Sequence, residues 1–186
     1  AVADAGGSIV TDDVRRLELT GNRVNTVHLA SGVSLPVDKL IICAGAYSHL
    51  LCRQLGEQVP LESERGYHMV LPDPGFSLSR SISYARTPGV ATPMEMGLRL
   101  AGTDEFAGLE AAPNYARADA LWSIFKRVFP ALREPGEAAT RWMGHRPGTP
   151  DSLPVIGPSA TASNVMYGFG HGHMGLTWGP TTGRLI

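Results

Sequence analysis

The hydrophobic pattern between residues 8 and 38 consists of short apolar runs separated by turns that contain glycine. The runs are Val14–Leu19, Val24–Leu29 and Val33–Val37, and the turns are Thr20–Asn22 and Ser31–Gly32. Turns of two or three residues between apolar runs are typical of antiparallel hairpins. We therefore predict a small three-stranded meander, which we interpret as a solvent-facing insertion without a ligand.

A fully apolar run, Leu40–Ala44, follows, and a segment with helical character, Ser48–Leu55, comes after it. A continuous apolar run of this length suits a strand buried in a parallel sheet. The small residues Ala44 and Gly45 permit close approach of a ligand at the end of that strand. On these residues alone, an ordinary strand-to-helix turn is the preferred interpretation.

Three further runs predict a second antiparallel sheet, namely Ser81–Tyr84, Gly89–Met94 and Met96–Thr103. A helix is predicted from Tyr115 to Val128, with Asn114 as its N-cap and a proline ending it. Its apolar residues recur at helical spacing and are expected in the core. They are Leu121, Trp122, Phe125 and Val128. A last strand is predicted at Thr140–His145, directly before Arg146.

A strand, a glycine-rich turn and the start of a helix are predicted between Asn164 and Gly183. Glycines in the turn let backbone N–H groups approach a partner closely, and the helix directs the positive end of its dipole at the same place. They are Gly168, Gly170, Gly172 and Gly175. This pattern implies an electron-rich or anionic partner.

Composition excludes several classes of function. The 186 residues include 16 lysines and arginines against 17 acidic residues, a formal net charge of -1, and no basic run that could follow a nucleic-acid backbone. No apolar run is long enough for a membrane span, and the first residues do not resemble a secretion signal. We therefore expect a protein without a nucleic-acid partner and without a membrane span.

Neither the cysteines nor the histidines indicate a metal site. Cys43 and Cys52 are too far apart for a Cys-x-x-Cys motif and too few for a disulfide framework. His171 and His173 lie two residues apart in a glycine loop, which makes them a poor pair of ligands. We expect no bound metal.

Two segments, Arg146–Gly157 and Gly170–Gly183, resemble the C-terminal signature of the FAD-dependent D-amino-acid oxidase superfamily, which includes glycine oxidase, sarcosine oxidase and bacterial D-amino-acid dehydrogenases. The first follows the pattern Arg-Pro-x-Thr-Pro-Asp-x-x-Pro-x-Ile-Gly, and the second has Gly-His-x-x-x-Gly before a helix with proline and glycine. Asp38–Ser48 and Gly102–Gly108 are similar to two further segments of the same family.

The resemblance implies FAD as the cofactor and a flavoprotein that oxidises the amine of a D-amino acid, glycine or a related amino acid. A hydride would pass from the substrate carbon to the flavin N5. Such a step needs orientation and a polarising environment more than a proton-transferring side chain. We therefore expect no catalytic acid or base.

The resemblance also assigns site residues. Arg146 is expected to bind the substrate carboxylate, because a guanidinium fork matches a carboxylate bidentately. Tyr67 and His68 are weaker substrate-binding candidates, as is His145; Gly66 is expected to adopt a backbone geometry that a side chain would forbid, and His68 to be a half-buried residue with its hydrogen bonds satisfied. Residues expected at the cofactor are Ala44, Gly45, Gly170, His171, Gly172, His173, Met174 and Gly175.

The predicted fold class is α+β to α/β: the C-terminal part of an FAD-binding, Rossmann-like domain with an inserted antiparallel-sheet substrate domain. Residues 1–59 and 146–186 are assigned to the FAD-binding domain and residues 60–145 to the substrate-binding domain. Ala1–Gly7 looks like the last turn of a helix capped by glycine, and Arg184–Ile186 ends inside a helix. The sequence is therefore expected to be a fragment of a longer protein.

The resembled enzymes open with a strand, Gly-x-Gly-x-x-Gly, a helix and then an acidic residue for the ribose. We expect that no such motif occurs in this chain, because Gly6–Gly7 does not supply it, and we therefore expect the fragment alone to be inactive. The alternative to an enzyme is a non-catalytic binding or assembly module of the same fold. Oxygen and a membrane quinone both stay open as electron acceptors, as do a cytoplasmic location, peripheral association with the inner membrane and a homo-oligomer.

Overall fold

The computed structural model describes residues 2–86 and 88–186, so Ala1 lies outside the described part. The chain divides into two compact units. The discontinuous unit consists of Ala1–Leu61 and Thr149–Ile186, and the inserted unit of Glu62–Gly148. Both boundaries lie slightly C-terminal to those expected from the sequence, which places Arg146 in the inserted unit.

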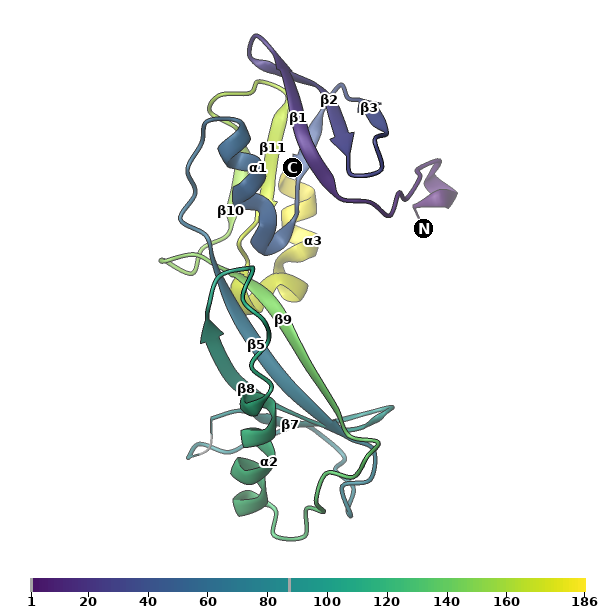
Figure 1. Ribbon diagram of the computed structural model, residues 1–186, viewed down its shortest axis with the longest axis vertical. Coiled ribbons are helices and arrows are strands. Elements are labelled where there is room, and N and C mark those ends of the chain that lie inside the picture. The colour runs from purple at the N-terminus through teal and green to yellow at the C-terminus, as the bar shows by residue number, and fades with distance from the viewer. Residues whose placement is uncertain (1, 87) are drawn as a thin grey trace. The chain divides into compact units, whose positions relative to one another are not determined.

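A three-stranded antiparallel sheet begins the discontinuous unit (Figure 1), with the order β1-β2-β3. Its strands are β1 (Val14–Thr20), β2 (Arg23–Leu29) and β3 (Ser34–Pro36). The predicted meander is confirmed. The solvent-facing interpretation is wrong for one face, because Val24 and Val27 are buried in a cluster with Ile42 and Tyr167. Alternate side chains of a strand point to one face, and here that face completes the core of the unit.

A second sheet has the order β10-β11-β4, in which β11 runs parallel to β4 and antiparallel to β10. Its strands are β4 (Leu40–Ile42), β10 (Val155–Pro158) and β11 (Val165–Phe169). The parallel strand predicted after the meander is confirmed, although Ile41 is 48% exposed. Asn164 ties this sheet to the meander, since its side chain accepts from the backbone N–H of Val24 and donates to the carbonyl of the same residue.

The helical segments of the discontinuous unit are short. They are η1 (Ala3–Ala5), η2 (Gly45–Tyr47), α1 (Ser48–Gln54), η3 (Gly172–Met174) and α3 (Gly175–Leu185). A left-handed Gly6 ends η1, as predicted, and the helix predicted after the glycine-rich turn is α3, which starts directly after Met174. Among the described helices, none is long and apolar enough to cross a membrane.

The inserted unit is an antiparallel sheet of five strands in the order β6-β7-β8-β5-β9. The strands are β5 (Glu62–Leu71), β6 (Ile82–Ser83), β7 (Val90–Met94), β8 (Gly97–Phe106) and β9 (Thr140–Gly148). The predicted sheet is confirmed. Helix α2 (Ala116–Val128) packs on one face, where Leu121 and Phe125 join Met69 and Leu100 in the core.

The expected N-cap of α2 is wrong. Tyr115 occupies the cap position, and no side chain caps the helix. Asn114 is one residue too early, and its backbone N–H instead donates to the hydroxyl of Tyr67 at 3.0 Å. The loop before α2 is therefore fastened to β5, a tertiary contact that no local pattern reveals.

Candidate functional site

Successive side chains of a strand point to opposite faces, so the residues of the inserted sheet divide into two sets. Met69 and Leu100 face α2. The alternate set, which we call the distal face, carries Arg146 and Trp142 from β9. In the ladder, Glu64 of β5 lies opposite Arg146. The other residues of the distal face used below are Gly66 and His68 of β5, Arg99 and Asp104 of β8, and Gly144 of β9.

Two glycines form the floor of the distal face. Gly66 and Gly144 lie opposite each other in the β5–β9 ladder. A Cβ at Gly66 would lie 2.1 Å from Nη2 of Arg146, and a Cβ at Gly144 would lie 1.9 Å from the indole ring of Trp142. Both long side chains therefore lie flat over backbone. The expectation of an unusual backbone at Gly66 is wrong, because its φ is not positive; what a side chain would forbid is the position of Arg146.

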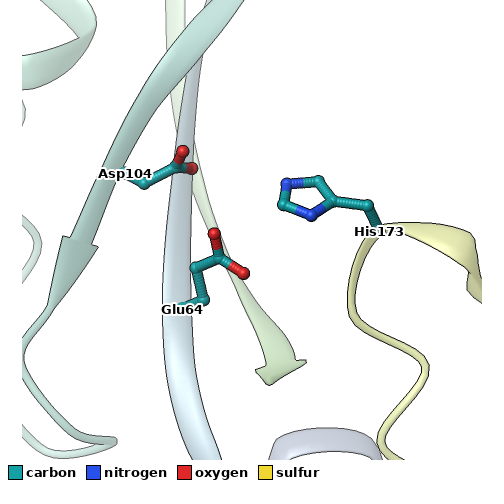
Figure 2. A group of neighbouring side chains, drawn as sticks. All are labelled: Glu64, Asp104 and His173. Carbon is teal, nitrogen blue, oxygen red and sulfur yellow. The ribbon is translucent and has the colours of Figure 1, made fainter. Parts of the chain in front are cut away.

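An acidic pair lies beside Arg146. Its Nη1 donates to Oδ1 of Asp104 at 2.5 Å, and the two side chains are 27% and 39% exposed. Figure 2 shows Asp104 on β8 and Glu64 on β5, whose carboxylates lie within 4.8 Å of each other; His173, also drawn there, belongs to the discontinuous unit. Asp104 thus orients the guanidinium of Arg146 from one side. The guanidinium and the Asp104 carboxylate both remain accessible to a ligand.

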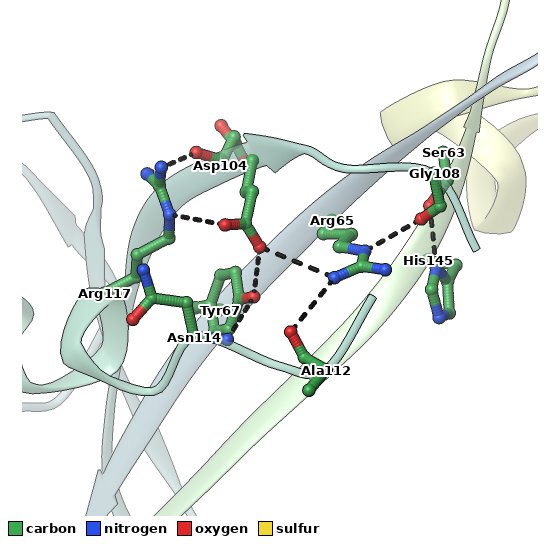
Figure 3. Close-up of polar contacts among 10 residues, drawn as sticks. Ser63, Arg65, Tyr67, Asp104, Gly108, Ala112, Asn114, Arg117 and His145 are labelled. Atoms are coloured by element: carbon green, nitrogen blue, oxygen red, sulfur yellow. Dashed lines mark hydrogen bonds and ion pairs between the residues drawn. The ribbon is translucent and has the colours of Figure 1, made fainter. Parts of the chain in front are cut away.

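A buried polar network holds the loop before α2 (Figure 3). Arg65 is fully buried, and its Nε donates to the carbonyl of Gly108 at 2.9 Å. The hydroxyl of Tyr67 donates to Oε2 of Glu105 at 2.5 Å, and Arg65 lies 3.7 Å from the same oxygen. The hydrogen bond from Tyr67 lowers the pKa of Glu105, as do the charges of Arg117 and Arg65, against a smaller opposing effect of burial.

This network also fixes Asp104. Arg117 forms an ion pair with Glu105 at 3.3 Å and donates from Nη1 to the backbone carbonyl of Asp104 at 2.9 Å. The backbone of Asp104 is thereby held by the β5–β8 ladder and by the side chain of Arg117 from α2. Tyr67 is 1% exposed and faces this network, so the structure separates it from Arg146. Its contact with a substrate stays a prediction.

The two histidines of the inserted unit lie on different faces. His68 stacks on Trp142 at 4.8 Å on the distal face, and its buried Nδ1 has no hydrogen-bond partner within the described part of the chain, so the expected satisfied histidine is wrong. Burial, and then the charge of Arg99, lowers the pKa of His68. His145 points the other way and shares a 2.6 Å hydrogen bond with Ser63. Burial, and then the charge of Arg65, lowers its pKa.

In the discontinuous unit, the glycine loop connects β11 to α3. Gly170 and Gly172 have φ values of 80° and 50°, which L residues rarely adopt. His171 is held by a 2.7 Å hydrogen bond between its Nε2 and the hydroxyl of Thr182. The loop therefore leads into α3 with a defined backbone, and the N–H groups of the first helical turn have no acceptors within the helix.

Ala44 and Gly45 come to the same sheet edge as the glycine loop. They follow β4, which pairs in parallel with β11, and the carboxyl ends of parallel strands meet at one edge. Ala44 is exposed, and Gly45 has a φ of 55° with open space around its Cβ position. The structure thus brings together the two groups of residues that the sequence assigned to the cofactor.

This edge fits the ring end of FAD. Leu176 is 97% exposed and Met174 is 41% exposed beside backbone donors and the positive end of the α3 dipole. Apolar side chains suit a flat aromatic ring, and N–H groups suit its electron-rich pyrimidine edge. The residues that would hold this part of the cofactor are Ala44, Gly45, Gly170, His171, Gly172, His173, Met174 and Gly175.

The loop has the spacing Gly-x-Gly-x-x-Gly at Gly170, Gly172 and Gly175, so the expectation that this spacing does not occur in the chain is wrong. The preceding strand β11 and the following helix α3 also agree with the fingerprint, but the packing of the third glycine does not. A Cβ at Gly175 would make an ordinary 3.5 Å contact with His171, whereas the third glycine of the fingerprint allows close packing of helix on strand. The third glycine therefore does not have the packing role that it has in the fingerprint.

Several residues of these sites were not assigned a role from the sequence: Arg65, Arg99, Asp104, Glu105 and Trp142. Arg65 alternates along β5 with Ser63 and Tyr67, and this polar alternation before the apolar Met69 and Leu71 is a weak signal for a polar network. The pairing of Arg146 with Asp104 spans 42 residues and has no local signal.

Comparison with known proteins agrees with the fold and the family resemblance. The family model of FAD-dependent oxidoreductases (DAO) matches residues 1–186. The chain is 39% identical over 184 residues to a D-amino-acid oxidase of Bradyrhizobium diazoefficiens, covering 98% of this chain and 44% of that protein. It is 32% identical to a D-amino acid dehydrogenase of Methylobacterium radiotolerans, covering 93% of this chain and 41% of that protein. The chain thus spans less than half the length of these relatives.

Solved structures show the same fold. An iminodiacetate oxidase from Chelativorans sp. BNC1 superposes with a TM-score of 0.81 at 23% identity, covering 98% of this chain and 50% of that one. A glycine oxidase from Geobacillus kaustophilus superposes with a TM-score of 0.76 at 22% identity, covering 98% and 49%. The predicted fold class and the predicted family are both confirmed. The chain belongs to the DAO family of FAD-dependent oxidoreductases.

Proposed function

We propose that the protein containing this chain oxidises the amine of a D-amino acid, glycine or a related amino acid, with FAD as the hydride acceptor. The observation that carries this proposal is Arg146, which lies on a glycine floor, is oriented by Asp104 and remains partly exposed. Membership of the DAO family and the relatives that act as D-amino-acid oxidases and dehydrogenases support the same reaction.

Arg146 is assigned to the substrate carboxylate. Its planar fork offers paired N–H donors, and a bidentate contact fixes the orientation of an amino acid better than a point charge does. Because Asp104 occupies only Nη1, other donors of the guanidinium stay available to a ligand. The proposed role of this residue is positioning and binding, without transfer of a proton.

The edge with the glycine loop is assigned to the flavin ring. When bound, FAD accepts the hydride from the carbon that carries the amine. The backbone of Gly172 to Gly175 and the dipole of α3 would stabilise negative charge on the pyrimidine side of the ring. No described residue favours oxygen or a quinone as the electron acceptor, so both remain part of the proposal. Peripheral membrane association and a homo-oligomer are also part of it.

The test uses the purified full-length protein. Under the proposal it is yellow, and D-alanine or glycine bleaches the flavin absorbance when oxygen is excluded and no other electron acceptor is added. Arg146→Lys keeps the charge and loses the fork, so it should raise KM about tenfold or more with unchanged flavin content. Arg127→Lys, an exposed position on α2, is the matched control.

A full-length protein that binds FAD and is not bleached by any amino acid would favour the non-catalytic module. If Arg146→Lys and Arg127→Lys both retain the kinetic constants of the parent, Arg146 does not bind the substrate.

A further inference from the structure

A second arginine lies on the distal face, and the proposed function does not use it. Arg99 is on β8 opposite Val70 of β5 and Thr92 of β7, and it is half-buried. Its neighbours Leu98 and Leu100 face α2, so strand alternation puts Arg99 on the same face as Arg146.

Arg99 makes no hydrogen bond or ion pair with any residue between 2 and 86 or between 88 and 186. The other arginine of this face has Asp104 at 2.5 Å. A half-buried cation without a counter-ion is unfavourable, because desolvation is not offset by an opposite charge. This arrangement is what a site for an anion requires before the anion binds.

The electrostatic environment of Arg99 agrees with this. Burial lowers the pKa of Arg99, and the positive charge of Arg146 lowers it further. Burial, and then the charge of Arg99, lowers the pKa of His68, so Arg99 acts on this neighbour of the distal face as well. The acidic pair Glu64 and Asp104 lies at the Arg146 end of the face.

We propose that Arg99 binds a second carboxylate on the substrate, so that the preferred substrates are amino acids with an acidic side chain. This inference rests on the proposed function for the role of Arg146 at the first carboxylate. Both arginines lie on the distal face, and Arg99 has no carboxylate partner there. Arg146 then binds one carboxylate of a dicarboxylate substrate, and Arg99 binds the other. An anion between them relieves their mutual repulsion, whereas a monocarboxylate at Arg146 leaves Arg99 unpaired.

Binding to the full-length protein gives a test that does not depend on turnover. Glutarate and butyrate have carbon skeletons of similar size and differ in the second carboxylate. We expect calorimetry to give a dissociation constant for glutarate at least about tenfold lower than for butyrate. Arg99→Gln should abolish this difference and leave the affinity for butyrate unchanged, while Arg127→Gln should preserve the difference.

Turnover gives the second readout. D-glutamate and D-glutamine have the same shape and differ in charge at the side-chain end. The parent protein should have a kcat/KM at least about tenfold higher for D-glutamate, and Arg99→Gln should remove that preference while retaining the rate with D-glutamine. Arg99→Lys should restore part of the preference, because it keeps the positive charge.

The outcomes separate the two proposals. Equal affinity for glutarate and butyrate, or an equal loss of both in Arg99→Gln, overturns the inference and indicates that Arg99 only covers apolar surface with its side-chain stem. Selective binding of glutarate without oxidation of any amino acid supports the Arg99 site and overturns the proposed function. Oxidation of D-glutamine and D-glutamate at equal rates supports the proposed function and overturns the inference.

Discussion

Replacing Gly66 with alanine moves Arg146 without removing its charge. The new Cβ would lie 2.1 Å from Nη2, and the shortest ordinary contact is 3.4 Å, so the guanidinium must move by at least about 1.3 Å. The backbone stays relaxed, since the φ of Gly66 is not positive. Because the obstructed atom is the end of a flexible side chain, we expect the free energy of unfolding to change by less than about 1 kcal/mol.

The cost should appear in substrate binding. A shift of more than 1 Å breaks the alignment of a guanidinium with a carboxylate, and a hydrogen bond to a charged group contributes about 1.5–3 kcal/mol. KM for D-alanine in the full-length protein should therefore rise about tenfold to about one hundredfold, with kcat little changed. Steady-state kinetics, the melting temperature and the flavin absorbance are measured on the same preparation.

Two controls make the result specific. Gly144→Ala is on the same rung of the ladder but obstructs Trp142, whose ring would lie 1.9 Å from the new Cβ, so its effect on KM for D-alanine should be smaller. In an Arg146→Gln background, Gly66→Ala should have no further effect on KM, because the two changes act on the same contact. An unchanged KM in Gly66→Ala, or additive effects in the double variant, would refute this account of the glycine floor.

Three further predictions follow from the described contacts. Gly172→Val puts a β-branched residue at a φ of 50° and should lower the flavin-to-protein absorbance ratio, while circular dichroism still reports the folded sheet of the inserted unit. The pKa of Glu105 is lowered from 4.5 in the folded state, so its contribution to stability is present above about pH 4.5 and is lost as the pH falls through the lower folded value. The melting temperature should therefore fall less steeply with acidification in Glu105→Gln than in the parent, and parallel curves would contradict this. The 186-residue chain alone should bind FAD with a dissociation constant above about 1 µM, because the third glycine of its Gly-x-Gly-x-x-Gly segment does not have the packing role that it has in the dinucleotide fingerprint; flavin fluorescence showing tighter binding would contradict it.

The sequence predicted those features that depend on neighbours along the chain. Short apolar runs with glycine turns identified the meander and strands β6 to β8, since these are hairpins whose strands follow one another, whereas the pairing of β5 with β8 and β9 is not sequential. The glycines before α3 predicted a loop with left-handed residues, and Gly170 and Gly172 have positive φ. Arg146 was identified only through its resemblance to a family motif, because arginine before proline has no meaning of its own.

Only the tertiary structure decided what surrounds these residues. Gly66 and Gly144 are far apart in sequence, and their pairing in the β5–β9 ladder is what lets Arg146 lie across the sheet. Adjacent residues of one strand point to opposite faces. Tyr67 therefore belongs to the buried network of Arg65, whereas His68 lies on the distal face near Arg99. Contacts of this kind depend on which strands pair and in which register, and a linear pattern of residues contains neither of these.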